Sequence, residues 1–511
     1  MPGELSTGTG QRLVLYDGGL PSLFKILALS PIFPRRSLPL NRSLDPQLFA
    51  LSAVDGRYRS KLEALSPLVS EAGLISYRLR VEAEWLLHLA AVPELASELR
   101  LNPKVQDALR RLIENVPEAA CARVKTLEQT TNHDVKAVEY YLRETLSEAG
   151  ADPRTLAFIH FACTSEDINN LAYALMLADA RKSVIGPAMQ EIIAQLEDMT
   201  RSYRDLPMLA RTHGQTASPT TLGKELAVFA HRLRRQVSQL KDVALEGKMS
   251  GAVGNYNAHW AAYPELDWVE IARRFIEDRL GLTQNLLTTQ IENHDSMVEF
   301  AGAISRFNTI LIGLCRDIWS YISIDYFKQE TKAGEIGSST MPHKVNPIDF
   351  ENAEGNCGVA NALAQHFAEK LPISRWQRDL TDSTVQRTWG TFLAHSLLAY
   401  LSLSKGLSKI KANPPVIAKD LAQAPEVLGE AIQTCMRRYG VVDAYERLKQ
   451  ATRGQKVEHA DLVKLIEGCA ELPLEAKKRL QAMTPDLYVG LAAQLVDLYF
   501  ERENAHATAR P

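Results

Sequence analysis

The sequence lacks the features that identify a membrane protein or a nucleic-acid-binding protein. Among its 511 residues 58 are basic and 61 are acidic, so the formal net charge is only -3. This balance argues against a general affinity for nucleic acid or for a membrane surface, because both need a basic excess. No apolar run approaches the roughly 20 residues that span a bilayer. We therefore expect no nucleic-acid partner and no membrane.

The sequence also lacks paired cysteines and the common cofactor motifs. Its six cysteines are far apart and form no C-x-x-C pair: Cys121, Cys163, Cys315, Cys357, Cys435 and Cys469. This spacing predicts reduced, mostly buried thiols in a cytoplasmic protein. There is no H-E-x-x-H metal motif and no G-x-x-x-x-G-K-[ST] phosphate loop. "GTGQRL" near the start lacks the third glycine of a dinucleotide fingerprint.

The first 45 residues differ from the rest, being rich in Gly, Pro and Ser and without helical periodicity. The apolar "LFKILALS" is short, contains Lys25 and follows Glu4 and Asp17, which makes it a poor signal peptide. We predict that residues 1–45 are a flexible extension that carries no chemistry.

Helical spacing of apolar residues dominates from Leu74 onward. No proline interrupts residues 296–330, and a helix of that length would be on the order of 50 Å long. Its seam advances in steps of four and three along Phe300, Ile304, Phe307, Leu311, Leu314, Ile318 and Tyr321. A second seam is Leu222, Leu226, Phe229, Leu233, Val237, Leu240 and Ala244, and a third is Met189, Ile192, Leu196, Met199 and Tyr203.

Helices this long bury their apolar stripes only against other helices. Alternating strand patterns are scarce, so we predict an all-α protein of three helical domains. Residues 46–153 would form an N-terminal domain and residues 154–407 a central long-helix bundle. Residues 408–511, where prolines interrupt shorter helices, would form a smaller C-terminal domain. The seams exceed what one small domain needs, which favours subunit association through a shared bundle.

Polar stretches between the helices are the candidates for function. In "RTHGQTASP" the glycine and proline mark a break ahead of a helix beginning near Thr220. His213 could exchange protons near neutral pH, or it could simply be satisfied by a helix end. In "TTNHDVKAVEY" His133 and Lys136 would share a helix face, unless the stretch is only a helix start capped by Thr131 or Asn132.

Two further stretches suit anions. "CTSEDINN" offers Thr164 and Ser165 before two acidic residues; Ser165 could cap a helix, or the free N–H groups and hydroxyls could bind a carboxylate. "RWQRDLTDSTVQR" combines arginines with hydroxyls, which suits phosphate or carboxylate, although a solvated charged face has the same composition. "GEIGSSTMPHKVNP" could be a surface loop or a mobile serine loop that closes over an anionic substrate.

The last of these stretches identifies a family. "GSSTMPHKVNP" (337–347) resembles the signature G-S-S-x-M-P-x-K-x-N-P of the fumarase/aspartase superfamily. "TSEDINN" and "RTHGQTASPTT" fit its other two marked regions in the same chain order. Within the superfamily, the chain from about Leu51 to the C-terminus is similar to bacterial adenylosuccinate lyases. The stretches that carry this similarity are "VDGRY", "HFACTSEDINN", "GAVGNYNAH" and "SRWQRDLTDST".

The resemblance implies a homotetramer built on a central helix bundle, with active sites where three subunits meet. It implies β-elimination of fumarate from nucleotide substrates, with Ser338 as the base and His213 as the general acid, and neither metal nor organic cofactor. The implied substrate-binding residues are Arg57, Tyr58, Asn132, His133, Asp134, Thr164, Ser165, Gln290, Lys344, Asn346, Arg378, Ser383, Thr384 and Arg387.

Two other functions are compatible with the signature loop. A sibling such as argininosuccinate lyase, fumarase or aspartase shares that loop, although the arginines and hydroxyls at 375–387 favour a phosphorylated substrate. A non-catalytic helical scaffold descended from a lyase would leave its catalytic residues free to decay, yet Ser338, His213 and Lys344 are all present.

Overall fold

The structure is a computed structural model that describes residues 46–330, 341, 344–452 and 457–509. The chain divides into two compact units, Met1–Phe49 and Ala50–Pro511. Of the first unit only the short 3-10 helix η1 (Pro46–Phe49) is described, and the predicted flexible extension of residues 1–45 lies outside the described residues. The elements from Ala50 onward belong to the second unit.

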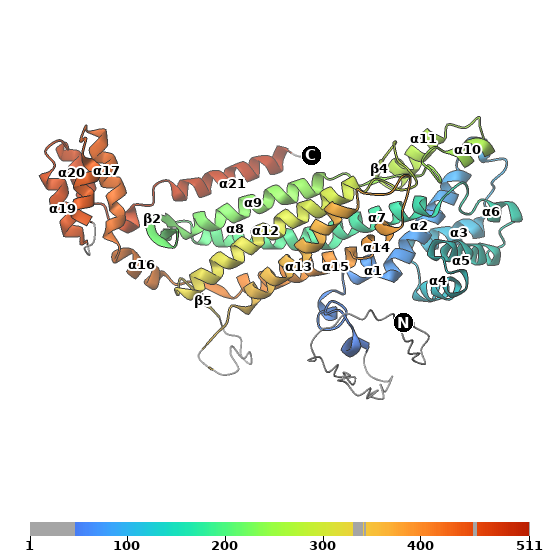
Figure 1. Ribbon diagram of the computed structural model, residues 1–511, viewed down its shortest axis with the longest axis horizontal. Coiled ribbons are helices and arrows are strands. Elements are labelled where there is room, and N and C mark those ends of the chain that lie inside the picture. The colour runs from blue at the N-terminus through green and yellow to red at the C-terminus, as the bar shows by residue number, and fades with distance from the viewer. Residues whose placement is uncertain (1–45, 331–340, 342–343, 453–456, 510–511) are drawn as a thin grey trace, which may run out of the picture. The chain divides into compact units, whose positions relative to one another are not determined.

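Long helices pack side by side in the centre of this unit (Figure 1). They are α7 (Ser165–Ala180), α8 (Gly186–Ser202), α9 (Leu222–Asp242), α12 (Asp295–Ser323), α13 (Ile348–Lys370) and α15 (Trp389–Leu407), with the π-helical turn η4 (Arg181–Ile185) joining α7 to α8. Helix α12 contacts α9 and α13, and α13 contacts α15. The predicted helical fold with a central long-helix bundle is confirmed.

Side-chain contacts fix the relative direction of α9 and α12. Arg306 of α12 donates to Gln236 of α9, with 3.0 Å between Nε and Oε1. One heptad further along α12, Gly313 lies against Phe229, which is one heptad earlier on α9. The two helices are therefore antiparallel, and the first turn of α9 lies beside the last turn of α12.

Helices α12 and α13 are antiparallel as well. The Trp319 indole donates to Glu351 at 3.1 Å, and the Asn361 amide donates to Thr309 at 3.2 Å. The start of α13 therefore lies beside the end of α12. These two registers determine which parts of the sequence meet at each end of the bundle.

The predicted seams lie inside the bundle. Along α12 the six seam residues from Phe300 to Ile318 are buried, and Tyr321 is half-buried. The helix ends at Ser323 rather than near residue 330, because Asp325 takes a left-handed conformation with φ 62° and the chain then enters a strand. On α9 the seam is buried at Leu222 and Leu233, whereas Ala244 lies beyond the helix and is exposed.

Three small two-stranded sheets depart from the all-helical expectation. Strands β1 (Pro207–Thr212) and β2 (Gln215–Thr221) form an antiparallel hairpin, which corrects the simple break predicted there. Strand β3 (Glu246–Gly247) pairs in parallel with β4 (Thr283–Gln284), and β5 (Phe327–Gln329) pairs antiparallel with β6 (Ile410–Ala412).

Shorter helices precede and interrupt the bundle. Those before it are η2 (Arg59–Lys61), α1 (Ser66–Val69), α2 (Glu71–Ala90), η3 (Pro93–Leu95), α3 (Pro103–Glu114), α4 (Glu118–Thr131), α5 (Asp134–Glu148) and α6 (Pro153–Ala157). Those between its long helices are α10 (Asn257–Ala262), α11 (Trp268–Arg273), the π-helical η5 (Arg274–Arg279) and α14 (Thr381–Gln386).

The C-terminal helices include a group with its own apolar core. The elements are α16 (Pro414–Ala422), η6 (Pro425–Leu428), α17 (Gly429–Arg438), α18 (Ala444–Thr452), α19 (His459–Gly468), α20 (Leu474–Gln481), η7 (Pro485–Leu487) and α21 (Ala492–Ala509). A cluster containing Ile432, Met436, Leu462 and Leu480 is separate from the main core. Helix α21 returns to pack on α9. The predicted domain boundaries stay predictions.

By length and composition, α12 is the one helix in the described ranges that could cross a membrane. However, 56% of its most apolar stretch is buried inside the protein, as in a bundle core helix. All six cysteines are free thiols; five are buried and Cys163 is half-buried, in agreement with the prediction.

Candidate active site

The N-terminus of α7 is organised by the carboxylate of Asp167. It accepts a hydrogen bond from the Thr164 backbone N–H at 2.7 Å, as in a capping box, and others from the N–H groups of Ser250 and Gly251. The Lys248 ammonium lies 3.0 Å away, and both side chains of this ion pair are fully buried. Asp167 thereby joins the helix start to the turn at 248–251.

Thr164 rather than Ser165 is the N-cap of α7, which corrects the expected capping role of Ser165. Ser165 is half-buried, and its hydroxyl makes no hydrogen bond within the described part of the chain. The first turn of α7 therefore presents a hydroxyl together with the positive end of a 16-residue helix. This arrangement can bind a carboxylate.

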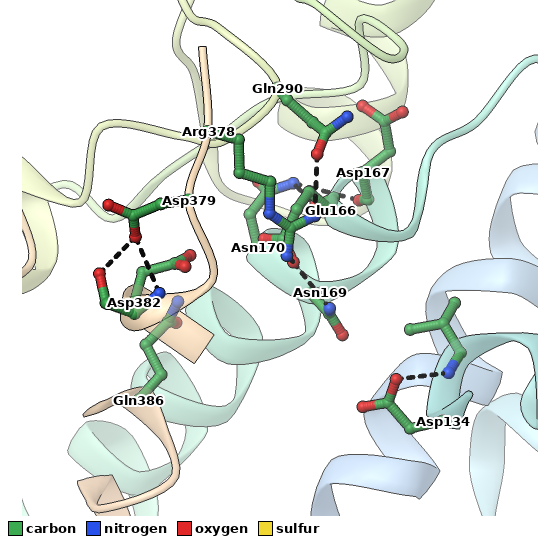
Figure 2. A network of polar contacts seen from close by, with 12 residues as sticks. Asp134, Glu166, Asp167, Asn169, Asn170, Gln290, Arg378, Asp379, Asp382 and Gln386 are labelled. Atoms are coloured by element: carbon green, nitrogen blue, oxygen red, sulfur yellow. Dashed lines mark hydrogen bonds and ion pairs between the residues drawn. The ribbon is translucent and has the colours of Figure 1, made fainter. Parts of the chain in front are cut away.

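Arg378 lies between two partners from distant parts of the sequence (Figure 2). Its Nη1 donates to Gln290 Oε1 at 3.0 Å, and its Nη2 donates to Glu166 Oε1 at 2.9 Å. Gln290 in turn donates to the Ala252 carbonyl at 3.0 Å. The structure thus brings together the predicted residues Gln290 and Arg378 beside Thr164 and Ser165.

A second predicted arginine, Arg387, is held by Asp134. The distance from Arg387 Nη2 to Asp134 Oδ2 is 3.0 Å, and the same carboxylate oxygen accepts from Arg78 at 2.7 Å. Burial alone would raise the pKa of Asp134, but the two guanidinium groups hold that pKa below its usual value. Asp134 is therefore an anion that orients Arg387.

His133 caps the helix that Asp134 begins. Its Nδ1 accepts from the Lys136 backbone N–H at 3.3 Å, so the N-cap is neither Thr131 nor Asn132. Asn132 instead ends α4 in a left-handed conformation with φ 48°. An accepting Nδ1 places the proton of the neutral ring on Nε2. The exposed His133 ring can therefore donate a hydrogen bond outward.

A buried histidine, His294, lies against α14, the short helix that carries the predicted hydroxyls Ser383 and Thr384. Its Nε2 is 3.4 Å from Asp382, and its backbone N–H donates to Glu292 at 2.7 Å. Ser383 is half-buried and Thr384 is exposed, and neither side chain makes a hydrogen bond within the described residues. Two of the predicted hydroxyls are thus available on a firmly held short helix.

Arg57 and Tyr58 lie just before η2. The Tyr58 hydroxyl accepts from the Asn352 amide at 3.5 Å, and Arg57 is exposed. A groove of about 290 Å³ beside them contains Arg59 and Arg387. Its other lining residues include Val54, Asp55, Ser70, Glu71 and Thr391. The groove therefore pairs Arg387 with Arg59, which sequence reasoning did not select.

His213 lies far from these groups. It occupies the two-residue turn between β1 and β2, where it has φ 53° and Gly214 has φ 73°, as in a type I′ turn. The side chain is exposed. Strand β2 leads directly into α9, whose first turn lies beside the last turn of α12. His213 is therefore at the opposite end of α12 from His294.

Lys344 and Asn346 belong to the same end as His213. They immediately precede α13, whose start lies beside the end of α12. Lys344 is exposed and Asn346 is half-buried, and Gln329 donates to the Val345 carbonyl at 2.8 Å. Ser338, the predicted base, lies outside the described residues.

The predicted site residues thus form two groups within one chain. Helix α12 has 29 residues, so at 1.5 Å per residue its ends are roughly 43 Å apart. Near its start are Thr164, Ser165, Gln290 and Arg378; near its end are His213, Lys344 and Asn346. No small substrate can contact both groups of a single chain. Among the described residues, no cluster of three or more His, Cys, Asp or Glu side chains could hold a metal ion.

Known proteins are similar to this chain over most of its length. A family described as "Lyase" matches residues 56–361, and one described as "Adenylosuccinate lyase C-terminal" matches residues 374–489. The adenylosuccinate lyases of Vibrio cholerae and Escherichia coli K12 are each 52% identical over 450 residues, which is 88% of this chain and 98% of theirs. That of Haemophilus influenzae is 50% identical over the same length.

The chain belongs to the adenylosuccinate lyase family. Solved structures of more distant proteins agree with its fold. A fumarate lyase from Mesorhizobium sp. BNC1 has a TM-score of 0.69 at 18% identity, covering 86% of this chain and 97% of that one. A 3-carboxy-cis,cis-muconate lactonizing enzyme from Pseudomonas putida has a TM-score of 0.70 at 21% identity, with the same coverage.

Within this adenylosuccinate lyase family member, several polar residues around the site were not predicted. Glu166 and Asn169 lie on α7, Arg78 on α2, and His294 and Asp382 at the starts of α12 and α14. All five are buried. The only signal in the sequence was a charged or polar residue among apolar neighbours, as in "LISYRLRV" around Arg78. Such a residue can be assigned a partner only after the fold is known.

Proposed function

We propose that this protein is an adenylosuccinate lyase. It would release fumarate by β-elimination from adenylosuccinate, giving AMP. It would also release fumarate from succinylaminoimidazole carboxamide ribotide, giving the free carboxamide ribotide. Relatives that bear this name and share half of the sequence over 88% of the chain support the proposal. These reactions would place the protein in purine biosynthesis.

The observation that carries the proposal is the division of the site residues between the two ends of α12. One end offers an exposed histidine and a lysine, which suit proton transfer and stabilisation of a carbanion. The other end offers arginines, hydroxyls and a helix N-terminus, which suit phosphate and carboxylate. Each group is chemically incomplete, so a working site needs both groups from different copies of the chain.

The elimination itself needs a base, an acid and a fixed cation. Ser338 would remove the proton next to a carboxylate of the succinyl group, and His213 would protonate the departing nitrogen. The doubly charged intermediate would be held by Lys344 and by the amide of Asn346. Thr164 and Ser165 at the start of α7 would bind a succinyl carboxylate through N–H groups and hydroxyls.

The nucleotide would be held by the groups near the start of α12. Arg378, Arg387, Ser383 and Thr384 would bind phosphate and ribose. Arg57 and Tyr58 would contribute from the segment before η2, where the Tyr58 hydroxyl contacts Asn352 of α13, toward the other end of α12. Gln290, Asn132 and Asp134 would complete this side, and the His133 ring would donate from Nε2. We propose neither metal nor organic cofactor, because acid–base and charge-stabilising groups suffice for this elimination.

We propose that the protein is a cytoplasmic homotetramer with no nucleic-acid or membrane partner. Apolar side chains that remain exposed on the long helices support association. Val228 of α9, Trp319 of α12, Val359 of α13 and Leu401 of α15 each expose at least 40% of their surface. Light scattering should give four times the mass of one chain.

The decisive experiment is a fumarate-release assay on three substrates supplied separately. Adenylosuccinate should release fumarate, whereas argininosuccinate and malate should not. Fumarate from argininosuccinate but not from adenylosuccinate would assign the protein to a sibling lyase. No fumarate from any of them, with an intact oligomer, would favour a non-catalytic scaffold.

The role of His213 can be tested separately from folding. Because its side chain is exposed at a hairpin tip, His213→Ala should leave the oligomer intact and reduce turnover by at least about 100-fold, the usual contribution of a general acid. The matched control is His366→Ala, which removes another exposed histidine, on α13. As long as this variant keeps the oligomer, its turnover should be unchanged. Near-normal turnover in His213→Ala would contradict the assigned role.

A further inference from the structure

Arg78 is a buried cation that none of the proposed chemistry uses. It lies near the middle of α2, and only 1% of its surface is exposed. An arginine is seldom buried so completely unless its guanidinium is paired and hydrogen-bonded. The contacts of Arg78 therefore indicate its role.

One side of the guanidinium leads to Arg378. Arg78 Nε donates to Asn169 Oδ1 at 2.8 Å, and the Asn169 amide donates to Glu166 Oε1 at 2.9 Å. The same Glu166 oxygen accepts from Arg378 Nη2 at 2.9 Å. Glu166 and Asn169 share a face of α7, and Figure 2 shows them in line with Arg378.

The other side leads to Arg387. Arg78 Nη2 donates to Asp134 Oδ2 at 2.7 Å, and Arg387 Nη2 donates to that same oxygen at 3.0 Å. Asp134 is also fixed by the Val135 backbone N–H, which donates to its second oxygen at 2.9 Å. A single planar guanidinium thus supports two acceptor groups, and each of these leads to one arginine of the proposed nucleotide site.

We infer that Arg78 is a positioning residue that sets the two proposed substrate-binding arginines, Arg378 and Arg387, at a fixed separation. The inference rests on the proposed function, because it assumes that these arginines bind the nucleotide. The rigid fork of an arginine can hold Asn169 and Asp134 at once, whereas the single ammonium of a lysine can hold only one of them at full strength. Arg78 itself touches no substrate in this arrangement.

The first test compares Arg78→Lys with Arg80→Lys. Arg80 lies two residues further along α2, is partly exposed and forms only a 3.5 Å ion pair with Asp179, so it is a matched control. We expect Arg78→Lys to raise KM for adenylosuccinate about tenfold, the effect of losing one charge-assisted hydrogen bond, and to change kcat less than about twofold. Arg80→Lys should change neither. Equal effects of the two variants would overturn the inference.

A merely structural role is excluded by combining Arg78→Lys with Arg378→Lys and, separately, with Arg387→Lys. If Arg78 acts through these arginines, its effect on KM should shrink in each background. Effects that multiply fully in both backgrounds would show that Arg78 stabilises only the fold. Should Arg78→Lys fail to form the oligomer, Asn169→Ser, which breaks only the link to Arg378, carries the same test against Arg378→Lys.

Calorimetric binding of AMP separates this inference from the proposed function. If wild-type protein binds AMP but releases no fumarate, the proposed function fails; a weaker AMP affinity in Arg78→Lys alone would still support the positioning role. If wild-type protein neither binds AMP nor releases fumarate, both proposals fail. If it releases fumarate and Arg78→Lys binds AMP as tightly as wild type, only the positioning role is overturned.

Discussion

Charged residues buried inside this protein are stabilised by their ion-pair and hydrogen-bond partners. Lys248 and Asp167 are both fully buried, 3.0 Å apart, and Lys248 also donates to the Gly251 carbonyl at 2.8 Å. Removing one member of such a pair leaves the other charge buried without compensation, which costs far more than losing an exposed pair.

We therefore expect Lys248→Met to reduce the free energy of unfolding by about 3–5 kcal/mol. Lys224→Met is the control, because Lys224 and Glu225 form a pair of the same 3.0 Å length that is about one-third exposed. That variant should lose no more than about 1 kcal/mol. Urea denaturation measures both, and similar losses would contradict the importance of burial.

His259 makes the folding stability of the protein depend on pH. The ring is fully buried between Trp268 and Tyr256, and neither ring nitrogen has a hydrogen-bond partner in the described part of the chain. Burial lowers the pKa of His259 to about 4, although the Asp167 carboxylate opposes this shift. The residue is therefore mostly neutral in the folded protein at pH values well above 4.

The sign of the effect follows from proton binding. Between pH 6.5 and pH 4 the unfolded chain binds a proton at His259 that the folded chain does not, so stability falls as the pH falls. The total loss is about 3 kcal/mol, complete near pH 4. His259→Phe should abolish this part of the acid dependence in unfolding titrations. An unchanged pH profile would contradict this account.

At the scale of elements, the segment after β3 approaches the Thr288–Thr289 backbone very closely. Gly254 has φ 81°, and a Cβ there would lie 2.8 Å from the Thr289 carbonyl oxygen and closer still to that of Thr288. The next residue is Gln290, the partner of Arg378. A side chain at position 254 would therefore displace a proposed substrate contact.

We expect Gly254→Ala to lower the melting temperature and to raise KM for adenylosuccinate at least about tenfold, because displaced contacts lose charge-assisted hydrogen bonds. Gly281→Ala is the control, since Gly281 has φ 70° but a Cβ there would meet nothing within 4 Å. That variant should lose about 1–2 kcal/mol of stability from backbone strain alone and keep its KM. Equal KM values would show that the 288–290 segment is not displaced.

The elements that the sequence predicted well are those with a long apolar period. The seam of α12 was visible because large buried apolar residues recur every three or four positions over most of the helix. The β1–β2 hairpin was missed because only Met208, Leu209 and the last residues of β2 are buried, so its sequence shows no alternation. The cap at His133 was missed because histidine is an uncommon N-cap.

The predicted site residues came from a family signature, and their chemistry could be read from their residue types. Their division between two ends of a bundle could not, because it depends on the register of antiparallel helices. That register is set by contacts such as Arg306 to Gln236, which join residues 70 positions apart. Buried links such as that from Arg78 to Asp134 were equally invisible before the fold was known.

At the scale of the whole molecule, two inactive variants should restore each other. His213→Ala damages one end of the bundle, and Arg378→Ala damages the other. If each active site combines the two ends from different chains, mixing the denatured variants and refolding them together should give about one-quarter of wild-type turnover, the statistical share of sites with two intact halves. Each variant refolded alone should stay inactive. No recovery in the mixed oligomer would place both residues in sites built by one chain.

The length of α12 has a consequence for how this sequence can change. Each residue of a helix advances the chain by 1.5 Å and turns it by about 100°. Deleting one residue inside α12 would therefore rotate everything after it, including the segment that carries Lys344, relative to everything before it. The antiparallel neighbours α9 and α13 would need the same deletion to stay in register. Insertions and deletions should therefore be confined to the connections between helices, while the lengths of α9, α12 and α13 can change only together.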